Sequence, residues 1–506
     1  MVLKFFFYGG FMKRIIASEK VTLDSNVYTG GGTDVTAELQ AVLDLALDGG
    51  VHLVMDGAAL VRGLKVHSNT VIECPNSSCG FFMADHSDKP LFVNDAWSID
   101  PEMRDKDISF IGGTYNHNCT KQAHDVPNSF HPWPSGGKLC EEYDESHFVY
   151  MMEFYGVENF KISGVSFRNQ RTFTLTVANF KNVIVEDSNI AMADHVHPSN
   201  QDGFHFFGPG QFLTLRNLRG CTGDDFINIG PDELDGVSSI TDILLDGIYF
   251  DNTCQGIRVL SRGTGMLDRL TVKNVTGSFR TFGFSINPFF HGETFGKYGD
   301  LYFENIDLRQ IEATYNYTPL TFFQVGGDFH CITMKNIRFH QPVRNSLMFD
   351  IGCPFFYRPS RETDGEIDHG DDYFDREWMP EIVRPRIENF IIDGLTVTSD
   401  EKFDGAHVFE LRYNVDNFVA KNIQLFRSEG SKPTVEFISM QKEAAVKNMI
   451  VEDIFAEKIS CVLNAGEDHK IDLLKMNNIL IKDSDKLLSA DKASIGARIE
   501  SGIVEI

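Results

Sequence analysis

One pattern of hydrophobic and polar positions recurs along the chain. In each copy, two alternating apolar residues are followed by a polar residue, then by Asn, Gly or Asp, and then by a second apolar alternation. Examples are "FKISGVSF" at 160–167 and "LTVKNVTG" at 270–277. Further copies begin at residues 183, 213, 243, 301, 332, 390, 418, 449 and 473. Alternation with a period of two and frequent β-branched residues predict short β-strands.

The spacing of the copies predicts how these strands are stacked. Successive copies lie about 23 to 31 residues apart, except for one double-length gap. A strand that bends at Asn or Gly and returns after such an interval lies on its predecessor, as in a coil of a parallel β-helix. A β-propeller or a sandwich would require longer regular blades or Asn-Gly hairpins, which the copies lack. We therefore expect an all-β fold, a right-handed single-stranded parallel β-helix that forms one domain over residues 1–506.

A helix is predicted ahead of the coils, at about residues 34–48. Asp34 or Thr36 can cap its start, and Gly49-Gly50 follows its end. Its apolar face at helical spacing comprises Leu39, Val42, Leu43, Ala46 and Leu47. Because the open end of a solenoid needs a cap for solubility, we expect this helix to cover the first coil.

Two segments interrupt the repeat, at 115–148 and 354–386. Insertions in solenoids often gather on the binding face, so both are predicted to be loops that wall a cleft. For the second segment, a solvated acidic loop is an equally good interpretation.

The amino-acid composition indicates which binding partners are excluded and which cellular compartment is expected. A formal net charge of −26 argues against nucleic acid and against an anionic membrane surface. The nine scattered cysteines are typical of reduced, buried thiols. The apolar run near the N-terminus precedes Lys13-Arg14 instead of following it. We therefore expect no signal peptide, and we expect a cytoplasmic location. Phenylalanine is abundant, at 43 residues against 3 tryptophans, which suggests a core of stacked aromatic rings.

Three aspartates are the candidate catalytic residues of the chain. Asp202 precedes the adjacent pair Asp224 and Asp225 by about one coil, so a β-helix places them on neighbouring rungs, ~4.8 Å apart. The adjacent pair can serve one cleft only at a bend, for which Gly223 provides the flexibility. Clustered carboxylates raise the pKa of at least one of them, which yields an acid beside a base. Such a pair can hydrolyse a glycosidic bond with inversion.

Arg258 follows about one coil further on, in "GIRVLSRG" at 256–263. Its guanidinium can clamp a substrate carboxylate or hydroxyls. A structural ion pair with one of the aspartates is the alternative.

These motifs resemble those of polygalacturonases and their relatives, glycoside hydrolase family 28 in the pectin-lyase-like β-helix group. The similarity lies in "NQDG" at 200–203, in "GDDFINIG" at 223–230, in "GIRVLSRG" and in the N-terminal "GGTDVTAELQAVLDLA". The resemblance implies Asp224 as general acid, Asp202 and Asp225 as the residues that activate water, and Arg258 as a substrate-binding residue. Asn200, which opens the first motif, is a further candidate for substrate binding.

The departures from the family pattern bear on the substrate. The Gly-His-Gly motif is missing, and Leu260 replaces the lysine of the Arg-Ile-Lys motif, which argues against plain polygalacturonan. His205 or His291 could supply the missing histidine, as could the histidines at 195 and 197, although each is more often structural.

The resulting hypothesis is an inverting glycoside hydrolase acting on a plant or microbial oligosaccharide of pectin type or a related type. No metal or cofactor is expected, and the oligomeric state stays open. A polysaccharide lyase of the same fold and a non-catalytic glycan-binding β-helix protein are the alternatives.

Overall fold

The computed structural model describes most of the chain as two compact units, one up to Gly223 and one from Asp224 onward. Each unit is described by itself, and the expected single domain stays a prediction. Among the residues described here, no helix is long and apolar enough to cross a membrane. The described residues are 12–96, 104–122, 150–192, 201–261, 263–287, 296–311, 320–341, 346–352, 386–400, 407–441, 444–466, 468–490 and 495–505.

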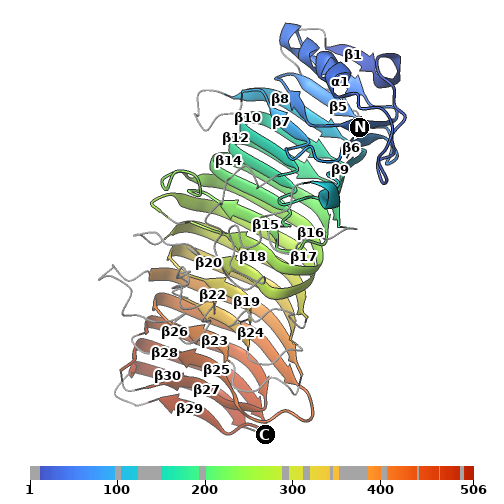
Figure 1. Cartoon of the computed structure of the whole chain (residues 1–506). Helices are drawn as coiled ribbons and strands as arrows, with labels where there is room; N and C mark the ends of the chain where they lie inside the picture. The colour runs from blue at the N-terminus through green and yellow to red at the C-terminus, as the bar shows by residue number, and fades with distance from the viewer. Residues whose placement is uncertain are drawn as a thin grey trace, which may run out of the picture. The chain divides into compact units, whose positions relative to one another are not determined.

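The first unit contains three short 3-10 helices, one α-helix and fourteen strands within its described residues (Figure 1). Its helical elements are η1 (Ala17–Glu19), α1 (Thr36–Leu43), η2 (Asp44–Asp48) and η3 (Cys119–Lys121). Its strands are β1 (Lys13–Ile16), β2 (Val51–Val54), β3 (Ala58–Val61), β4 (Leu64–Val66), β5 (Thr70–Glu73), β6 (Gly80–Met83), β7 (Phe92–Asn94), β8 (Asp105–Ile111), β9 (Thr114–Asn116), β10 (Met152–Ser163), β11 (Ser166–Arg168), β12 (Leu175–Glu186), β13 (Asn189–Ala191) and β14 (Phe204–Gly220).

The second unit consists of strands throughout its described residues. They are β15 (Asp225–Gly230), β16 (Ile240–Val259), β17 (Met266–Ile286), β18 (Lys297–Gln310), β19 (Leu320–Val325), β20 (Asp328–Gln341), β21 (Ser346–Ile351), β22 (Arg386–Ser399), β23 (His407–Leu411), β24 (Asn414–Arg427), β25 (Val435–Met440), β26 (Ala445–Glu457), β27 (Ile459–Ala465), β28 (Lys470–Lys482), β29 (Lys486–Ala490) and β30 (Ile495–Glu505). Every predicted repeat from 160 to 480 falls on strands of one unit or the other.

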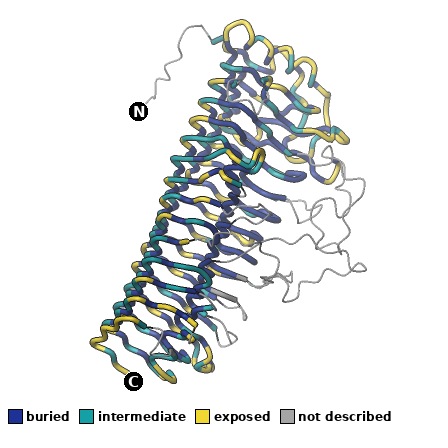
Figure 2. Tube along the Cα trace, turned by 90° about the vertical axis from the view of Figure 1, so that its left-hand side faces the viewer, coloured by how far each residue is buried: buried dark blue, intermediate teal, exposed yellow. Residues whose placement is uncertain are grey.

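Parallel ladders connect the coils within each unit. In the first unit, β4 and β7 continue through the first halves of β10, β12 and β14. In the second unit, β15 continues through the ends of β16 and β17 and then through β19, β21, β23, β25, β27 and β29. All of these pairings are parallel, and the predicted right-handed parallel β-helix is confirmed. In Figure 2, buried residues run along the strands and exposed ones gather at the bends.

Stacked phenylalanines fill the core of the second unit, as the composition suggested. Phe284, Phe323, Phe349 and Phe409 occupy the same register position on successive rungs. Their ring centroids are 5.7, 5.9 and 4.8 Å apart in that order, and all four side chains are fully buried. Since neighbouring residues of a strand point to opposite faces, Ser285 and its register partners point out of the core.

Asparagines make the bends that the repeat predicted. Asn274, Asn305 and Asn336 have φ angles of 57°, 56° and 51°, in the left-handed region that asparagine tolerates better than most residues. The Nδ2 group of Asn305 donates to Oδ1 of Asn274 at 3.1 Å, and that of Asn336 donates to Oδ1 of Asn305 at 2.7 Å. The side-chain amides therefore form a ladder along the bend.

The capping helix is confirmed in slightly altered form. The α-helix α1 ends at Leu43 and continues as the 3-10 helix η2 to Asp48, and α1 packs on β2 and β4. The N-cap residue is Val35, which makes no side-chain cap hydrogen bond, so neither Asp34 nor Thr36 holds the predicted cap position. Asp34 Oδ1 instead accepts the backbone N–H of Thr36 at 3.1 Å from one residue further out. Leu47, predicted on the apolar face, is 66% exposed. That part of the prediction is wrong because a 3-10 turn has three residues instead of 3.6, which rotates Leu47 away from the core.

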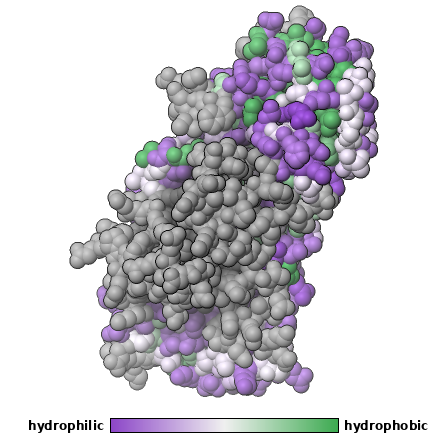
Figure 3. Space-filling view, viewed as in Figure 1, coloured by the Kyte–Doolittle hydropathy of each residue, from purple (hydrophilic) through white to green (hydrophobic). Residues whose placement is uncertain are grey.

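The two predicted loop insertions lie largely outside the described residues. At the first, Tyr115 and Asn116 still belong to β9, so the interruption begins later than predicted. At the second, the described residue Arg386 already belongs to β22. On the face of the first unit visible in Figure 3, hydrophilic side chains predominate and hydrophobic ones form small groups.

Candidate active site

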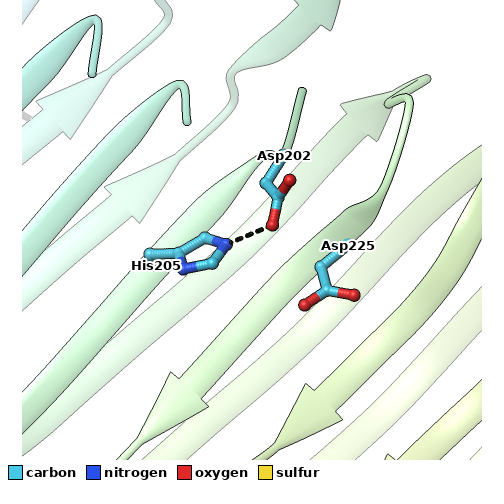
Figure 4. A group of neighbouring side chains, drawn as sticks. All are labelled: Asp202, His205 and Asp225. Carbon is cyan, nitrogen blue, oxygen red and sulfur yellow. Dashed lines mark hydrogen bonds and ion pairs between the residues drawn. The ribbon is translucent and has the colours of Figure 1, made fainter. Parts of the chain in front are cut away.

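Asp202 and His205 form a buried pair in the first unit. His205 lies on β14 and Asp202 lies two residues ahead of that strand, and both are 3% exposed. The Nε2 atom of His205 is 2.8 Å from Oδ2 of Asp202 (Figure 4). The backbone carbonyl of Asp202 accepts hydrogen bonds from the hydroxyl and the N–H of Thr174, at 2.9 and 3.1 Å. The previous coil therefore fixes the backbone that carries the carboxylate.

An aromatic stack orients the imidazole of His205. Its ring lies 3.8 Å from that of Phe173 at an interplanar angle of 19°. Phe173 in turn stacks on Tyr150 at 4.7 Å and 8°. Of the histidines considered from the sequence, His205 is thus the one that the structure places against a predicted catalytic aspartate. His291 and the histidines at 195 and 197 lie outside the described residues, as does Asn200.

Asp224 and Asp225 occupy the bend that the sequence required of them. Asp224 lies in the bend itself, whereas Asp225 is the first residue of β15. Both are buried, at 7% and 1% exposed. Oδ1 of Asp224 accepts the amide of Gln255 at 3.2 Å, and its backbone carbonyl accepts the hydroxyl of Thr253 at 2.8 Å. The bend thereby lets two adjacent acids keep separate sets of partners.

Asp225 is held by an amide and a guanidinium. Its Oδ2 atom accepts Nδ2 of Asn228 at 2.9 Å and Nη1 of Arg258 at 3.2 Å. Burial raises the pKa of Asp225 above its usual range, the charge of Arg258 opposes this rise, and the neighbouring Asp224 adds to it. A carboxyl group in this environment can hold or release a proton near neutral pH.

Arg258 takes the structural ion pair that the sequence left as its alternative. The guanidinium and the Asp225 carboxylate are 7% and 1% exposed. Their strands β15 and β16 run in register, with Asp225 opposite Gln255 and Asn228 opposite Arg258. The role of Arg258 in substrate binding stays a prediction.

Several buried acceptor atoms of the second unit have no hydrogen-bond partner among the described residues. Those on β15 and β16, the strands that carry Asp225 and Arg258, are Oδ1 of Asp225, Oδ1 of Asn228 and Oε1 of Gln255. Buried polar atoms are nearly always satisfied, so acceptors of this kind suit a ligand that brings hydroxyl donors. The sequence analysis missed Asn228 and Gln255, whose signal was their position on the same strands as Asp225 and Arg258.

The predicted residues therefore fall into two groups. Asp202 and His205 belong to the first unit, and Asp224, Asp225 and Arg258 belong to the second. That Asp202 shares one cleft with the other two aspartates, as their spacing along the chain indicates, stays a prediction.

Comparison with known proteins identifies the class that this arrangement resembles. The sequence model of glycosyl hydrolases family 28 matches residues 128–341, a range that contains all five of these residues. The resemblance to polygalacturonase-like proteins drawn from the sequence is therefore confirmed, and it supports a glycoside hydrolase.

The chain is similar to several solved structures, of which the following three are distant in sequence. The family 28 exopolygalacturonase of Yersinia enterocolitica is 12% identical over 97% of this chain and 78% of its own, with a TM-score of 0.48. The exopolygalacturonase of Thermotoga maritima is 12% identical over 93% and 91%, with a TM-score of 0.46. The surface adhesin PfbA of Streptococcus pneumoniae is 14% identical over 97% and 92%, with a TM-score of 0.39. No curated protein matches the chain.

Proposed function

We propose that this protein is an inverting glycoside hydrolase that cleaves a pectin-type or related oligosaccharide. Asp224 acts as the general acid, Asp202 and Asp225 activate the water, and Arg258 contributes to substrate binding. The family match over residues 128–341 supports the reaction class. The absence of the Gly-His-Gly motif and the presence of Leu260 favour a substrate other than plain polygalacturonan.

The observation that carries this proposal is the environment of the adjacent acids in the second unit. Two buried carboxyl groups, Asp224 and Asp225, follow one another at a bend among acceptors that suit a hydroxyl-rich ligand. The raised pKa of Asp225 suits a base that takes a proton from water near neutral pH. A hydrolase of this type needs one protonated carboxyl and one ionised carboxylate at the same pH. Like-charge repulsion between neighbours is the simplest way to keep two aspartates in different protonation states.

In the proposed reaction, the carboxyl of Asp224 gives its proton to the glycosidic oxygen, and the bond from this oxygen to the anomeric carbon breaks. A water molecule attacks the anomeric carbon from the opposite face and loses its proton to the carboxylate of Asp202 or Asp225. The product sugar then has the inverted configuration. This requires about 6.5–9.5 Å between acid and base, which leaves room for the water.

We also propose a cytoplasmic location, where small imported fragments are the available substrates. Exo action on the ends of such fragments then follows more naturally than endo action on a polymer. A net charge of −26 also disfavours a densely anionic polymer.

The variant Asp224→Asn tests the assignment of the acid. It keeps the shape of the side chain and removes its proton, so kcat/KM is expected to fall about 10²- to 10⁴-fold. Asp235→Asn is the matched control, because Asp235 is an exposed residue of the same unit that accepts hydrogen bonds from the turn at Val237 and Ser238. Full activity of Asp224→Asn on the best substrate would contradict the proposed role.

The products separate this reaction from its alternatives. Time-resolved NMR of the first product should show the inverted anomer. A polysaccharide lyase would instead create a double bond that absorbs ultraviolet light, and its activity would disappear with a chelator. A protein that only binds glycans would cleave nothing across a broad panel of pectin-derived oligosaccharides.

A further inference from the structure

Two rows of side chains cover the outer face of the first unit next to Asp202. They stand in register on β10, β12 and β14 and consist of Glu153, Thr176 and His205 in one row and of Tyr155, Ala178 and Phe207 in the other. The intervening residues Phe154, Val177 and Phe206 are fully buried in the core. Because neighbouring residues of a strand point to opposite faces, both rows point away from that core, on the face that bears His205. The row of Tyr155, Ala178 and Phe207 forms a buried hydrophobic cluster on this face.

Glu153 is the carboxyl group of these two rows, and the proposed reaction does not use it. Its side chain is half-buried, and it forms no ion pair among the described residues. Burial raises its pKa to about 7, against a smaller opposing effect of a hydrogen bond with Tyr155. The ionised Glu153 carboxylate, with no cation paired to it, would repel a second carboxylate placed beside it. The repulsion is strong because the low-polarity surroundings that raise the pKa of Glu153 also strengthen the interaction between like charges.

Two other features of this face suit a sugar. The hydroxyl of Thr176, between Glu153 and His205, is fully buried and has no hydrogen-bond partner in the described part of the chain. The stacked rings of Tyr150, Phe173 and His205 border the same row. Aromatic faces pack against the C–H groups of sugars, while hydroxyl and carboxyl groups bind their hydroxyls.

We propose that Glu153 is a specificity-determining residue, which selects an uncharged sugar unit at this face and rejects a uronate carboxylate there. The sugar's hydroxyls bind the Glu153 carboxyl group and the Thr176 hydroxyl, and its ring packs beside the aromatic stack. This inference rests on the proposed function, because it concerns the substrate of the same site. It explains how a family 28-like protein that lacks the Gly-His-Gly motif can use a neutral relative of polygalacturonate.

The selection should depend on pH, because only the ionised carboxylate repels a uronate. Among the described residues of β4, β7, β10, β12 and β14, the titratable groups in register with Glu153 or beside it on this face are Tyr155 on the same strand and His205 on β14. Lys65 on β4 lies one rung beyond Val93. Discrimination against a uronate is therefore expected to be weak at a pH of about 5 and to grow as the pH rises through about 7.

The experiment compares oligogalacturonides, which carry a charged carboxylate at C6, with their methyl esters, which carry a neutral ester there. Hydrolysis and binding of both probes are measured for wild type and Glu153→Gln, at pH of about 5 and about 8. Glu158→Gln is the matched control, because Glu158 lies on the same strand but pairs with Lys106 at 2.9 Å. Thermal unfolding of the three proteins checks that the exchange leaves the fold intact.

Wild type should prefer the methyl esters by about 10- to 100-fold at the higher pH, and Glu153→Gln should reduce this ratio about tenfold. The ratio of the control should not change. If both probes are cleaved but Glu153→Gln leaves the ratio and its pH dependence unchanged, the inference is wrong and the proposed hydrolase stands. If neither probe is cleaved, the proposed reaction fails on them, and binding by calorimetry decides the inference by the same ratio.

Discussion

Replacement of Arg258 by leucine should destabilise the second unit through the carboxylate that it leaves behind. Oδ2 of Asp225 would keep its hydrogen bond from Asn228 but lose the guanidinium 3.2 Å away, in surroundings where the two side chains are only 7% and 1% exposed. At an effective dielectric constant of about 20, the attraction over this distance is ~5 kcal/mol. Breaking a buried pair from one side costs about 3–5 kcal/mol in practice, and we expect a loss of this size.

The sign of the pH dependence follows from the same carboxyl group. Without Arg258, the folded-state pKa of Asp225 rises further above its unfolded value, so the folded state binds more protons than the unfolded state over a wider range. Above the pKa that Asp225 has in wild type, the gap in stability should widen by about 1.4 kcal/mol per pH unit. It stops widening once the pH passes the pKa that Asp225 has in the variant.

Chemical denaturation followed by circular dichroism, at pH of about 5 and about 8, measures the difference in the free energy of unfolding between wild type and Arg258→Leu. The double variant Arg258→Leu/Asp225→Asn removes the buried charge and should recover most of the loss, with little remaining pH dependence. Arg269→Leu is the matched control, because its ion pair with Asp242 is solvent-exposed and screened. If Arg258→Leu cost no more than this control, or if the double variant recovered nothing, the reasoning about the buried pair would be refuted.

Two further predictions concern stability. Burial lowers the pKa of His117 from 6.5 to about 4. The buried neutral imidazole therefore stabilises the folded state fully above a pH of about 6.5. As the pH falls towards about 4, about 3 kcal/mol of the free energy of unfolding is lost. His117→Gln should flatten the acid limb of the stability curve in this window, and an unchanged slope would contradict the assignment. In the asparagine ladder, Asn305→Ala should cost about 1–2 kcal/mol more than Asn305→Gly, because both lose the bonds to Asn274 and Asn336 but only alanine is strained at a φ of 56°. Equal losses in thermal or chemical unfolding would show that the backbone conformation does not matter there.

Much of the fold was predictable because a coil repeats locally. The alternation of apolar residues, the asparagines at the bends and the capping helix each depend on a few neighbouring residues, and the structure confirms all three. Leu47 was misplaced because the change from an α-helix to a 3-10 helix depends on packing rather than on the spacing of apolar residues. The bend at Asp224 was also predictable, since two adjacent acids on a regular strand cannot face the same side.

The amino-acid sequence by itself predicted which residues carry the chemistry, and it determined their order and the interval of about one coil between them. Only the tertiary structure decided their partners: Arg258 beside Asp225, Phe173 against His205, and Glu153 two rungs from His205 on the same face. The physical reason is register. Coils of unequal length bring residues together through hydrogen-bonded ladders whose alignment depends on the bends and bulges between them, and neither spacing nor composition encodes that alignment residue by residue.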